Sequence, residues 1–230
     1  MKTLGLLGGM SWESTSSYYQ RLNRLTRERM GGQHSAPLLI WSAEFASIAA
    51  MQHSGDWDGA ADVLVDAARR LEVAGADALL ICANTMHKLA DQVSAAVTIP
   101  VLHVVDATAA AIRAAGVVRP LLIATRFTME ENFYRDRLRA GGVEAVVPDP
   151  VARERLHSMI FDELVQGRFE PASRAEVVAI VSQAVAEGAD GVILGCTEFA
   201  LLVGPDDLPV PVFDTTEIHV LAGLDFALAR

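Results

Sequence analysis

Short apolar runs alternate with longer amphipathic stretches along the whole chain. The apolar runs lie at residues 3–7, 37–42, 78–81, 101–103, 121–124, 144–147, 191–194 and 210–213. Between them, stretches such as residues 56–74 and 173–187 carry apolar side chains at helical spacing. This alternation predicts an α/β protein in which mainly parallel sheets are flanked by helices.

An internal repeat indicates two related halves. Residues 75–85 (GADALLICANT) align without a gap on residues 188–198 (GADGVILGCTE). Each copy predicts a helix end, a turn, a buried strand and a polar tip. A second, weaker sequence similarity follows each copy, between residues 100–106 and residues 209–214. We therefore predict two similar domains related by a pseudo-twofold axis, the first comprising residues 1–106 with about 215–230 and the second residues 107–214.

The polar tips of the repeat predict where a ligand binds. Ligands of open α/β sheets bind beyond the carboxyl ends of the strands. The tips are Ala83-Asn84-Thr85 in the first half and Cys196-Thr197-Glu198 in the second. We expect both to line one cleft between the domains, an arrangement that suits chemistry on two faces of a small molecule.

Charge and composition exclude several classes of partner. The chain has 19 Lys and Arg against 29 Asp and Glu, a net charge of -10, and no basic run, which argues against nucleic acid as a partner. No apolar run approaches the roughly 20 residues of a membrane span. The N-terminal sequence lacks the apolar stretch and cleavage site of a signal peptide. Two well-separated cysteines are typical of reduced thiols rather than a disulfide framework, so we expect a cytoplasmic protein.

Nothing in the sequence indicates a metal or a cofactor. The six histidines form neither an H-E-x-x-H motif nor a cluster with cysteine at ligand spacing. A pyridoxal phosphate Schiff base would depend on Lys88, since Lys2 is the only other lysine. The Gly8-Gly9-Met10-Ser11 turn matches neither G-x-G-x-x-G nor a P-loop. We predict no metal and no cofactor.

The two cysteines are the first candidates for chemistry. Cys196 follows a predicted strand, where the N–H groups of the next helix start and the Thr197 hydroxyl can orient or activate a thiol. The alternative is a buried cysteine that acts as a small hydrophobe. The gapless repeat pairs Cys196 with Ala83 and leaves Cys82 one position early, and a shift of one residue along a strand reverses the side-chain direction. Cys82 therefore either points into the core or is turned toward the cleft by a bulge.

The other polar tips have binding and structural interpretations. Asn84 and Thr85 can bind a substrate carboxylate or cap the next helix. His87 is either a proton donor or a histidine satisfied within the protein.

Two further loops can hold the substrate. The Gly9-Met10 backbone forms either a carboxylate nest or a plain strand-to-helix turn. The loop with Thr125 and Thr128 can hold the far end of the substrate, and Thr128 can also cap the following helix.

Three segments carry a family resemblance. They are LLGGMSW at residues 6–12, CANTMH at residues 82–87 and GCTE at residues 195–198. With these segments the chain resembles the aspartate/glutamate racemase family across nearly its full length. The resemblance implies two α/β domains with the active site between them, no cofactor, and a homodimer. It also implies racemisation of a small amino acid, aspartate or glutamate by default, in which one cysteine removes the α-proton and a second on the opposite face returns one.

The resemblance also assigns roles, and the chain departs from the family pattern at one of them. Cys196 is one acid/base group and Cys82 is its partner, but the family cysteine usually stands directly before Asn-Thr, where this chain has Ala83. Either a bulge brings Cys82 into the site, or His87 or a water serves that face, or the chemistry is one-sided. One-sided chemistry would make the chain a one-cysteine decarboxylase or cis–trans isomerase of the same superfamily, and loss of the second base would leave a non-catalytic module that binds a small acid.

Gln52 is placed in the loop after the second strand, where it would contact the substrate side chain. The predicted substrate-binding residues are Gly9, Met10, Gln52, Ala83, Asn84, Thr85, Thr125, Thr128, Thr197 and Glu198.

Overall fold

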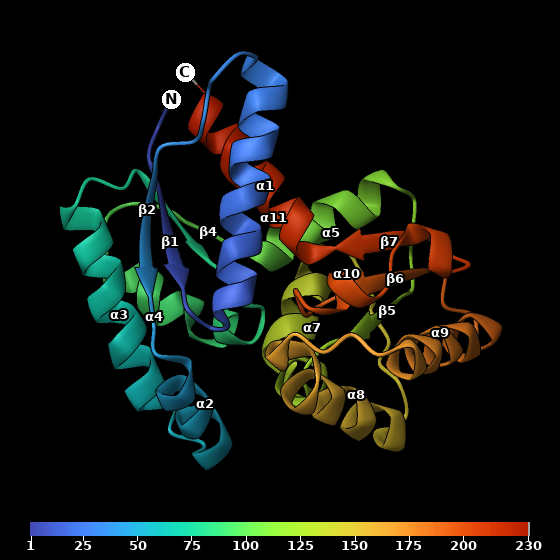
Figure 1. Cartoon of the computed structure of the whole chain (residues 1–230). Helices are drawn as coiled ribbons and strands as arrows, with labels where there is room; N and C mark the ends of the chain where they lie inside the picture. The colour runs from blue at the N-terminus through green and yellow to red at the C-terminus, as the bar shows by residue number, and fades with distance from the viewer. Residues whose placement is uncertain (230) are drawn as a thin grey trace. The chain divides into compact units, whose positions relative to one another are not determined.

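The computed structural model describes residues 1–229 and contains two compact units, each built on its own parallel sheet (Figure 1). Unit 1 comprises residues 1–104 with the segment from His219 onward, and unit 2 comprises residues 105–218. The chain passes to unit 2 near the start of α5 (Val104–Ala114) and returns within α11 (Thr215–Leu228). The sequence predicts these crossings after residues 106 and 214. The predicted fold class, α/β with parallel sheets flanked by helices, is confirmed.

The sheet of unit 1 has four parallel strands in the order β2-β1-β3-β4. These are β1 (Leu4–Gly8), β2 (Leu38–Ser42), β3 (Ala78–Ile81) and β4 (Val101–Leu102). The helical elements are α1 (Trp12–Met30), α2 (Phe45–Ser54), α3 (Trp57–Val73), the 3₁₀-helix η1 (Thr85–Leu89) and α4 (Ala90–Ala95). Every residue of β1 and β3 is buried, because helices cover both faces of the sheet.

The two faces of β3 belong to different cores. Leu79 and Ile81 join the cluster formed with residues of α3 and α4. Ala78 and Leu80 join the cluster formed with residues of α1 and α11. This alternation is the period of two that a strand imposes on its side chains.

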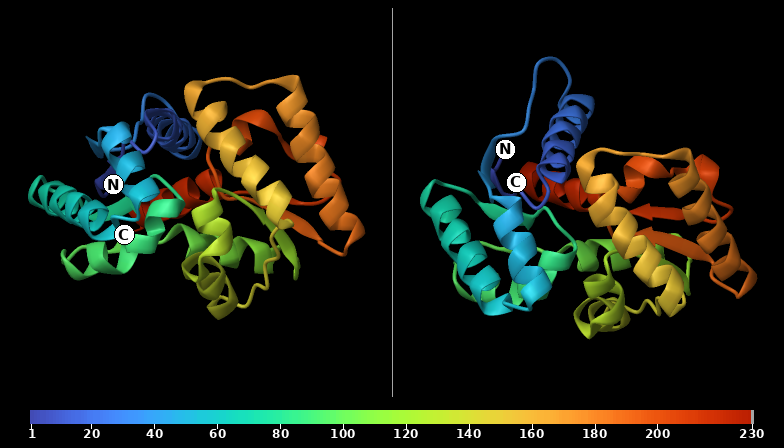
Figure 2. Two further views of the ribbon diagram at one scale, coloured as in Figure 1. Left: turned by 90° about the horizontal axis from the view of Figure 1, so that it is seen from below. Right: turned by 60° about the horizontal axis from the view of Figure 1, so that its bottom comes forward.

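The sheet of unit 2 has three parallel strands in the order β5-β6-β7. These are β5 (Pro120–Ile123), β6 (Gly191–Leu194) and β7 (Val212–Asp214). The helices are α5, α6 (Arg126–Glu130), α7 (Asn132–Ala140), α8 (Pro150–Asp162), α9 (Pro171–Ala186) and α10 (Phe199–Leu202), with 3₁₀ turns η2 (Leu164–Gln166) and η3 (Pro205–Asp207). Within unit 2, α8 and α9 are neighbours, and the chain connects them through η2 and a short loop (Figure 2).

The predicted strand at residues 144–147 is wrong. Only one isolated parallel bridge, between Leu121 and Val146, joins this segment to β5. The Val146 N–H donates to the Pro120 carbonyl at 2.9 Å, and the Leu122 N–H donates to the Val146 carbonyl at 2.8 Å. Pro148 follows and has no N–H to donate, so the ladder does not extend.

The repeated Gly-Ala-Asp segments have the same structural function in both units. Gly75 and Gly188 adopt φ values of 99° and 96° in the turn after α3 and α9, where a side chain would be strained. The Asp77 carboxylate accepts a backbone N–H at the start of β1, and the Asp190 carboxylate accepts two immediately before β5. The repeat therefore encodes how a helix ends and how the next strand is aligned on its neighbour.

In the described part of the chain, residues 1–229, no helix has both the length and the apolar character needed to cross a bilayer.

Candidate functional site

Cys196 and Glu198 form a buried pair just beyond the end of β6. The Cys196 thiol donates a hydrogen bond to Oε2 of Glu198 at 3.0 Å, and the two residues are 8% and 4% exposed. Burial raises the pKa of the Cys196 thiol well above its ordinary value, and the neighbouring Glu198 carboxylate raises that pKa further. The thiol is therefore protonated, and the Glu198 carboxylate is its hydrogen-bond acceptor.

A glycine, Gly195, allows the chain at the end of β6 to pack closely against Leu122 and Ala124. A Cβ on Gly195 would lie 2.8 Å from Cδ1 of Leu122 and 3.0 Å from Cβ of Ala124, closer than packing permits. The Thr215 hydroxyl donates to the Leu194 carbonyl at 2.8 Å and fixes the strand end from the neighbouring chain segment. Thr197, the predicted binding residue between Cys196 and Glu198, is also buried.

The predicted loop of unit 2 is a helix cap. The Thr125 hydroxyl accepts the Thr128 N–H at 3.4 Å and lies 3.2 Å from the Thr128 hydroxyl. Thr125 is the N-cap of α6, which corrects the predicted capping role of Thr128, and both residues are buried. The two hydroxyls stand beyond β5, the strand next to β6.

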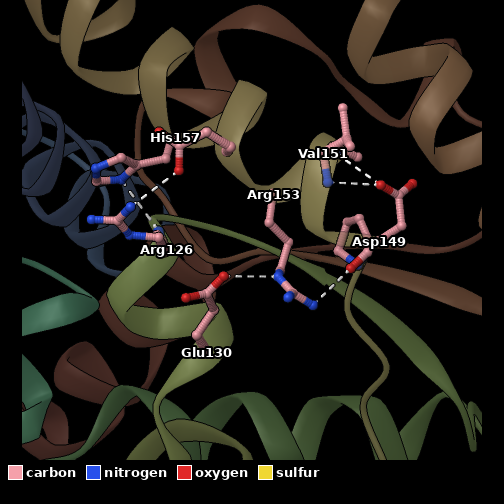
Figure 3. Close-up of polar contacts among 9 residues, drawn as sticks. Arg126, Glu130, Asp149, Val151, Arg153 and His157 are labelled. Atoms are coloured by element: carbon pink, nitrogen blue, oxygen red, sulfur yellow. Dashed lines mark hydrogen bonds and ion pairs between the residues drawn. The ribbon is translucent and has the colours of Figure 1, made fainter.

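Helix α8 holds this loop in place (Figure 3). The backbone N–H of Arg126 donates to Nδ1 of His157 at 3.3 Å. The guanidinium of Arg126 pairs with the Glu154 carboxylate at 3.1 Å. One turn further along α6, Glu130 pairs with Arg153 at 3.0 Å. These residues are 23 to 31 positions apart in sequence, so no local pattern reveals them.

In unit 1, Cys82 lies in the core. It continues the even-numbered face of β3, is 0% exposed, and belongs to the same apolar cluster as Leu4, Leu6 and Leu80. Its thiol lies 3.8 Å from the Leu80 carbonyl. Burial raises the pKa of the Cys82 thiol far above its ordinary value. The partly buried Ala83 packs against the opposite core cluster.

Asn84, Thr85 and His87 follow at the tip of β3 and are all buried. Nε2 of His87 accepts the Val104 N–H at 3.2 Å, so that nitrogen carries no proton. Nδ1 of His87 lies 2.9 Å from the Ala83 carbonyl and donates to it. His87 is thus a neutral histidine whose two nitrogens connect the tip of β3 to the start of α5.

Gln52 lies in α2, which corrects the expectation that it belongs to a loop. Glu44 caps this helix by accepting the N–H groups of Ala46 and Ser47, and the alanine-rich segment that follows favours helix. The Gln52 side chain is buried and donates to Sδ of Met86 at 3.0 Å. This contact joins α2 to η1, which carries Thr85 and His87.

The glycine turn after β1 is held by internal contacts. Gly9 has a φ of 81°, and its N–H donates to Oγ1 of Thr15 at 2.8 Å. Ser11 caps α1 by accepting the Ser14 N–H at 3.3 Å, and Met10 is buried. The Gly9 N–H is therefore used by the protein itself, while the turn brings Met10 and Ser11 to the end of β1.

Among residues 1–229, no three His, Cys, Asp or Glu side chains lie close enough together to share a metal ion.

Comparison with known proteins identifies relatives along the whole chain. The model of the Asp/Glu/Hydantoin racemase family matches residues 7–223. The chain is 21% identical to the broad specificity amino-acid racemase RacX of Bacillus subtilis (strain 168), over 93% of this chain and 92% of that protein.

Solved structures with the same fold are more similar in sequence. A protein of Yersinia pestis, described as a candidate Asp/Glu racemase, is 45% identical with a TM-score of 0.92, over 100% of both chains. An aspartate racemase homologue from Pyrococcus horikoshii OT3 is 36% identical with a TM-score of 0.87, again over 100% of both chains.

Proposed function

The chain belongs to the Asp/Glu/Hydantoin racemase family, and from this premise we propose that it is a cofactor-independent amino-acid racemase in which Cys196 transfers protons at the α-carbon. The family assignment implies an isomerase. The observation that carries the proposal is the buried Cys196–Glu198 pair at the end of β6. Aspartate and glutamate are the first substrates to test, with neutral amino acids beside them.

The pair supplies both directions of proton transfer. In one direction the Cys196 thiol gives its proton to the substrate carbanion, which forms the new C–H bond and leaves a thiolate. In the other, Sγ first transfers its proton to Oε2 of Glu198, and the resulting thiolate then removes the α-proton. Exclusion of water strengthens each of these electrostatic interactions and assists proton transfer from the α-carbon to the thiolate and back from the thiol to the carbanion.

The substrate's polar groups need fixed partners. In this proposal the buried hydroxyls of Thr125 and Thr197 bind the substrate, together with Asn84 and Thr85. Thr128 fixes the Thr125 hydroxyl. Three other predicted binding residues, Gly9, Met10 and Gln52, act by supporting backbone and packing, since the Gly9 N–H and the Gln52 amide already bind protein groups.

Inversion requires a second group on the other face of the α-carbon. The Cys82 thiol is buried among apolar side chains, and both nitrogens of His87 bind backbone groups. We therefore assign the second proton to a water held by Asn84 and Thr85. The burial of Cys82 also favours a second candidate function, a one-cysteine decarboxylase or cis–trans isomerase.

The test is α-proton exchange in deuterated buffer, followed by proton NMR and chiral chromatography. Both enantiomers of aspartate, glutamate and several neutral amino acids are incubated with wild type, Cys196→Ala and Cys82→Ala. We expect exchange with inversion in wild type and Cys82→Ala, and none in Cys196→Ala. Loss in both variants would restore Cys82 as the second base. Exchange with none of the amino acids would reject the racemase and direct the search to small diacids, with release of carbon dioxide as the readout.

The proposal includes a homodimer in the cytoplasm. Both cysteines are free thiols, as expected in a reducing compartment. Light scattering coupled to size-exclusion chromatography tests the dimer, and a monomeric mass at working concentration would reject it.

A further inference from the structure

A cavity lies entirely within unit 2, and none of the residues that line it belongs to the candidate site. Its volume is about 610 Å³, within the range of small-molecule sites. It is lined by residues of β5, the segment with the isolated bridge, the start of α8 and one face of α9. Figure 2 shows α8 and α9 as neighbours in this part of the molecule.

The walls of this cavity combine apolar side chains with charged ones. Leu121 and Val146, the two residues of the isolated bridge, contribute from the sheet side. Ile180 and Ala184 contribute from α9, and Ala152 from α8. An apolar body of a ligand would therefore leave water on entering.

The acidic groups around the cavity are already engaged. The Glu144 carboxylate accepts two hydrogen bonds from Arg139, at 3.0 and 3.1 Å. The Asp149 carboxylate accepts two N–H groups in the first turn of α8. Glu187 accepts from the Gln183 side chain at 2.6 Å.

Two arginines also line the cavity, and one has an unused donor. Arg119 donates to the Glu187 carbonyl at 2.8 Å. Nε of Arg135 is buried and has no hydrogen-bond partner among residues 1–229. A buried donor on a charged group is unfavourable unless it is paired, so this nitrogen lacks the acceptor that its environment calls for.

We propose that this cavity binds a small monocarboxylate with an apolar body, held through its carboxylate by Arg135. A carboxylate matches the planar donor set of a guanidinium and forms a charge-assisted hydrogen bond with it. The apolar part of the lining, which includes Leu121, Val146 and Ile180, accepts the rest of the molecule. The proposal is independent of the racemase reaction, because the cavity residues are separate from those assigned to proton transfer.

The test uses octanoate as the probe, with isothermal titration calorimetry on the full chain. Octan-1-ol is the matched neutral ligand. Two variants test the two features separately: Arg135→Gln removes the charge, and Ala179→Phe fills the cavity from an exposed position on α9. We expect saturable binding of octanoate to wild type, weakened about tenfold or more in Arg135→Gln and abolished in Ala179→Phe.

Three results would overturn the proposal. They are absence of saturable octanoate binding, equal affinity for octan-1-ol, and binding that persists unchanged in both variants. Circular dichroism checks that both variants are folded. Their exchange activity should equal that of wild type, which keeps this test separate from that of the proposed function.

Discussion

The Cys196 thiol donates a hydrogen bond to Glu198 over 3.0 Å in a place that solvent hardly reaches. The two residues are separated by one residue in sequence, so a tight turn beyond β6 is enough to bring them together. Burial and the nearby negative charge both favour the protonated thiol. Burial and the carboxylate together keep the group that we propose for catalysis in its thiol form.

Glu198→Gln should lower the pKa of Cys196 and reduce catalysis. The carboxylate raises the thiol pKa, so its removal shifts that pKa downward and thiolate forms at lower pH. The proton acceptor is lost at the same time, and kcat should fall about a hundredfold. The pH dependence of iodoacetamide alkylation, in a Cys82→Ala background, measures the shift. Asp206→Asn, an exposed position in η3, is the control, and an unchanged alkylation profile in Glu198→Gln would refute the pairing.

His157 should position the Thr125 loop through a single acceptor atom. Its Nδ1 accepts the Arg126 N–H, and its ring contacts those of Phe127 and Phe161, with centroids 5.6 and 4.9 Å away. His157→Asn keeps an acceptor at the δ position, whereas His157→Leu does not. We expect KM for the racemised substrate to rise about tenfold in His157→Leu and to stay near wild type in His157→Asn. Equal effects in both variants would show that only packing matters here.

The sequence predicted what depends on neighbouring residues. The Gly-Ala-Asp repeat located β3 and β6 at their observed bounds, because the helix end and the strand follow from local chemistry. The one-residue offset of Cys82 left two directions open from the sequence, into the core or toward the cleft through a bulge, and the structure has the first.

Contacts between distant segments were not predictable. His157 and Arg135 belong to no motif, and their roles arise only when α8 and α7 fold onto the sheet of unit 2. The strand expected at residues 144–147 failed for a related reason, because its extent is limited by Pro148 and by the start of α8. The helical position of Gln52 was missed because a short alanine-rich segment gives little amphipathic signal.

Gly9→Ala should destabilise the protein more than Gly55→Ala. Both glycines have a φ near 80°, at 81° and 77°. A Cβ on Gly9 would lie 2.2 Å from the backbone nitrogen of Ala43, whereas a Cβ on Gly55 would meet nothing within 4 Å. Gly55→Ala should therefore lower the free energy of unfolding through backbone strain alone, by about 1 kcal/mol. Gly9→Ala adds the steric clash with Ala43, so its loss should exceed that of Gly55→Ala by at least about 2 kcal/mol. Urea titration followed by circular dichroism measures the difference, and equal losses would contradict the close approach.

His219 should make unit 1 sensitive to acid. Burial lowers the pKa of His219 from 6.5 to about 4. Its Nε2 donates to the Leu102 carbonyl at 2.7 Å, and its Nδ1 accepts from the Tyr18 hydroxyl at 2.9 Å. The neutral His87 ring lies nearby, with centroids 5.5 Å apart. A proton on Nδ1 would remove the acceptor for Tyr18 and add an uncompensated charge.

The direction of the pH effect follows from these two pKa values. The unfolded chain binds the proton below its pKa of 6.5, while the folded chain resists it down to about 4, so stability is lost as the pH falls through this window. Between about pH 7.5 and about pH 5, His219 should lower the free energy of unfolding by about 2 kcal/mol. His219→Gln retains a donor for the Leu102 carbonyl but does not titrate. Between the same two pH values, the free energy of unfolding of this variant should therefore fall by about 2 kcal/mol less than that of wild type. Urea titrations of both proteins at both pH values measure these changes in the free energy of unfolding. Equal changes in wild type and in His219→Gln would exclude His219 as the source of the acid sensitivity.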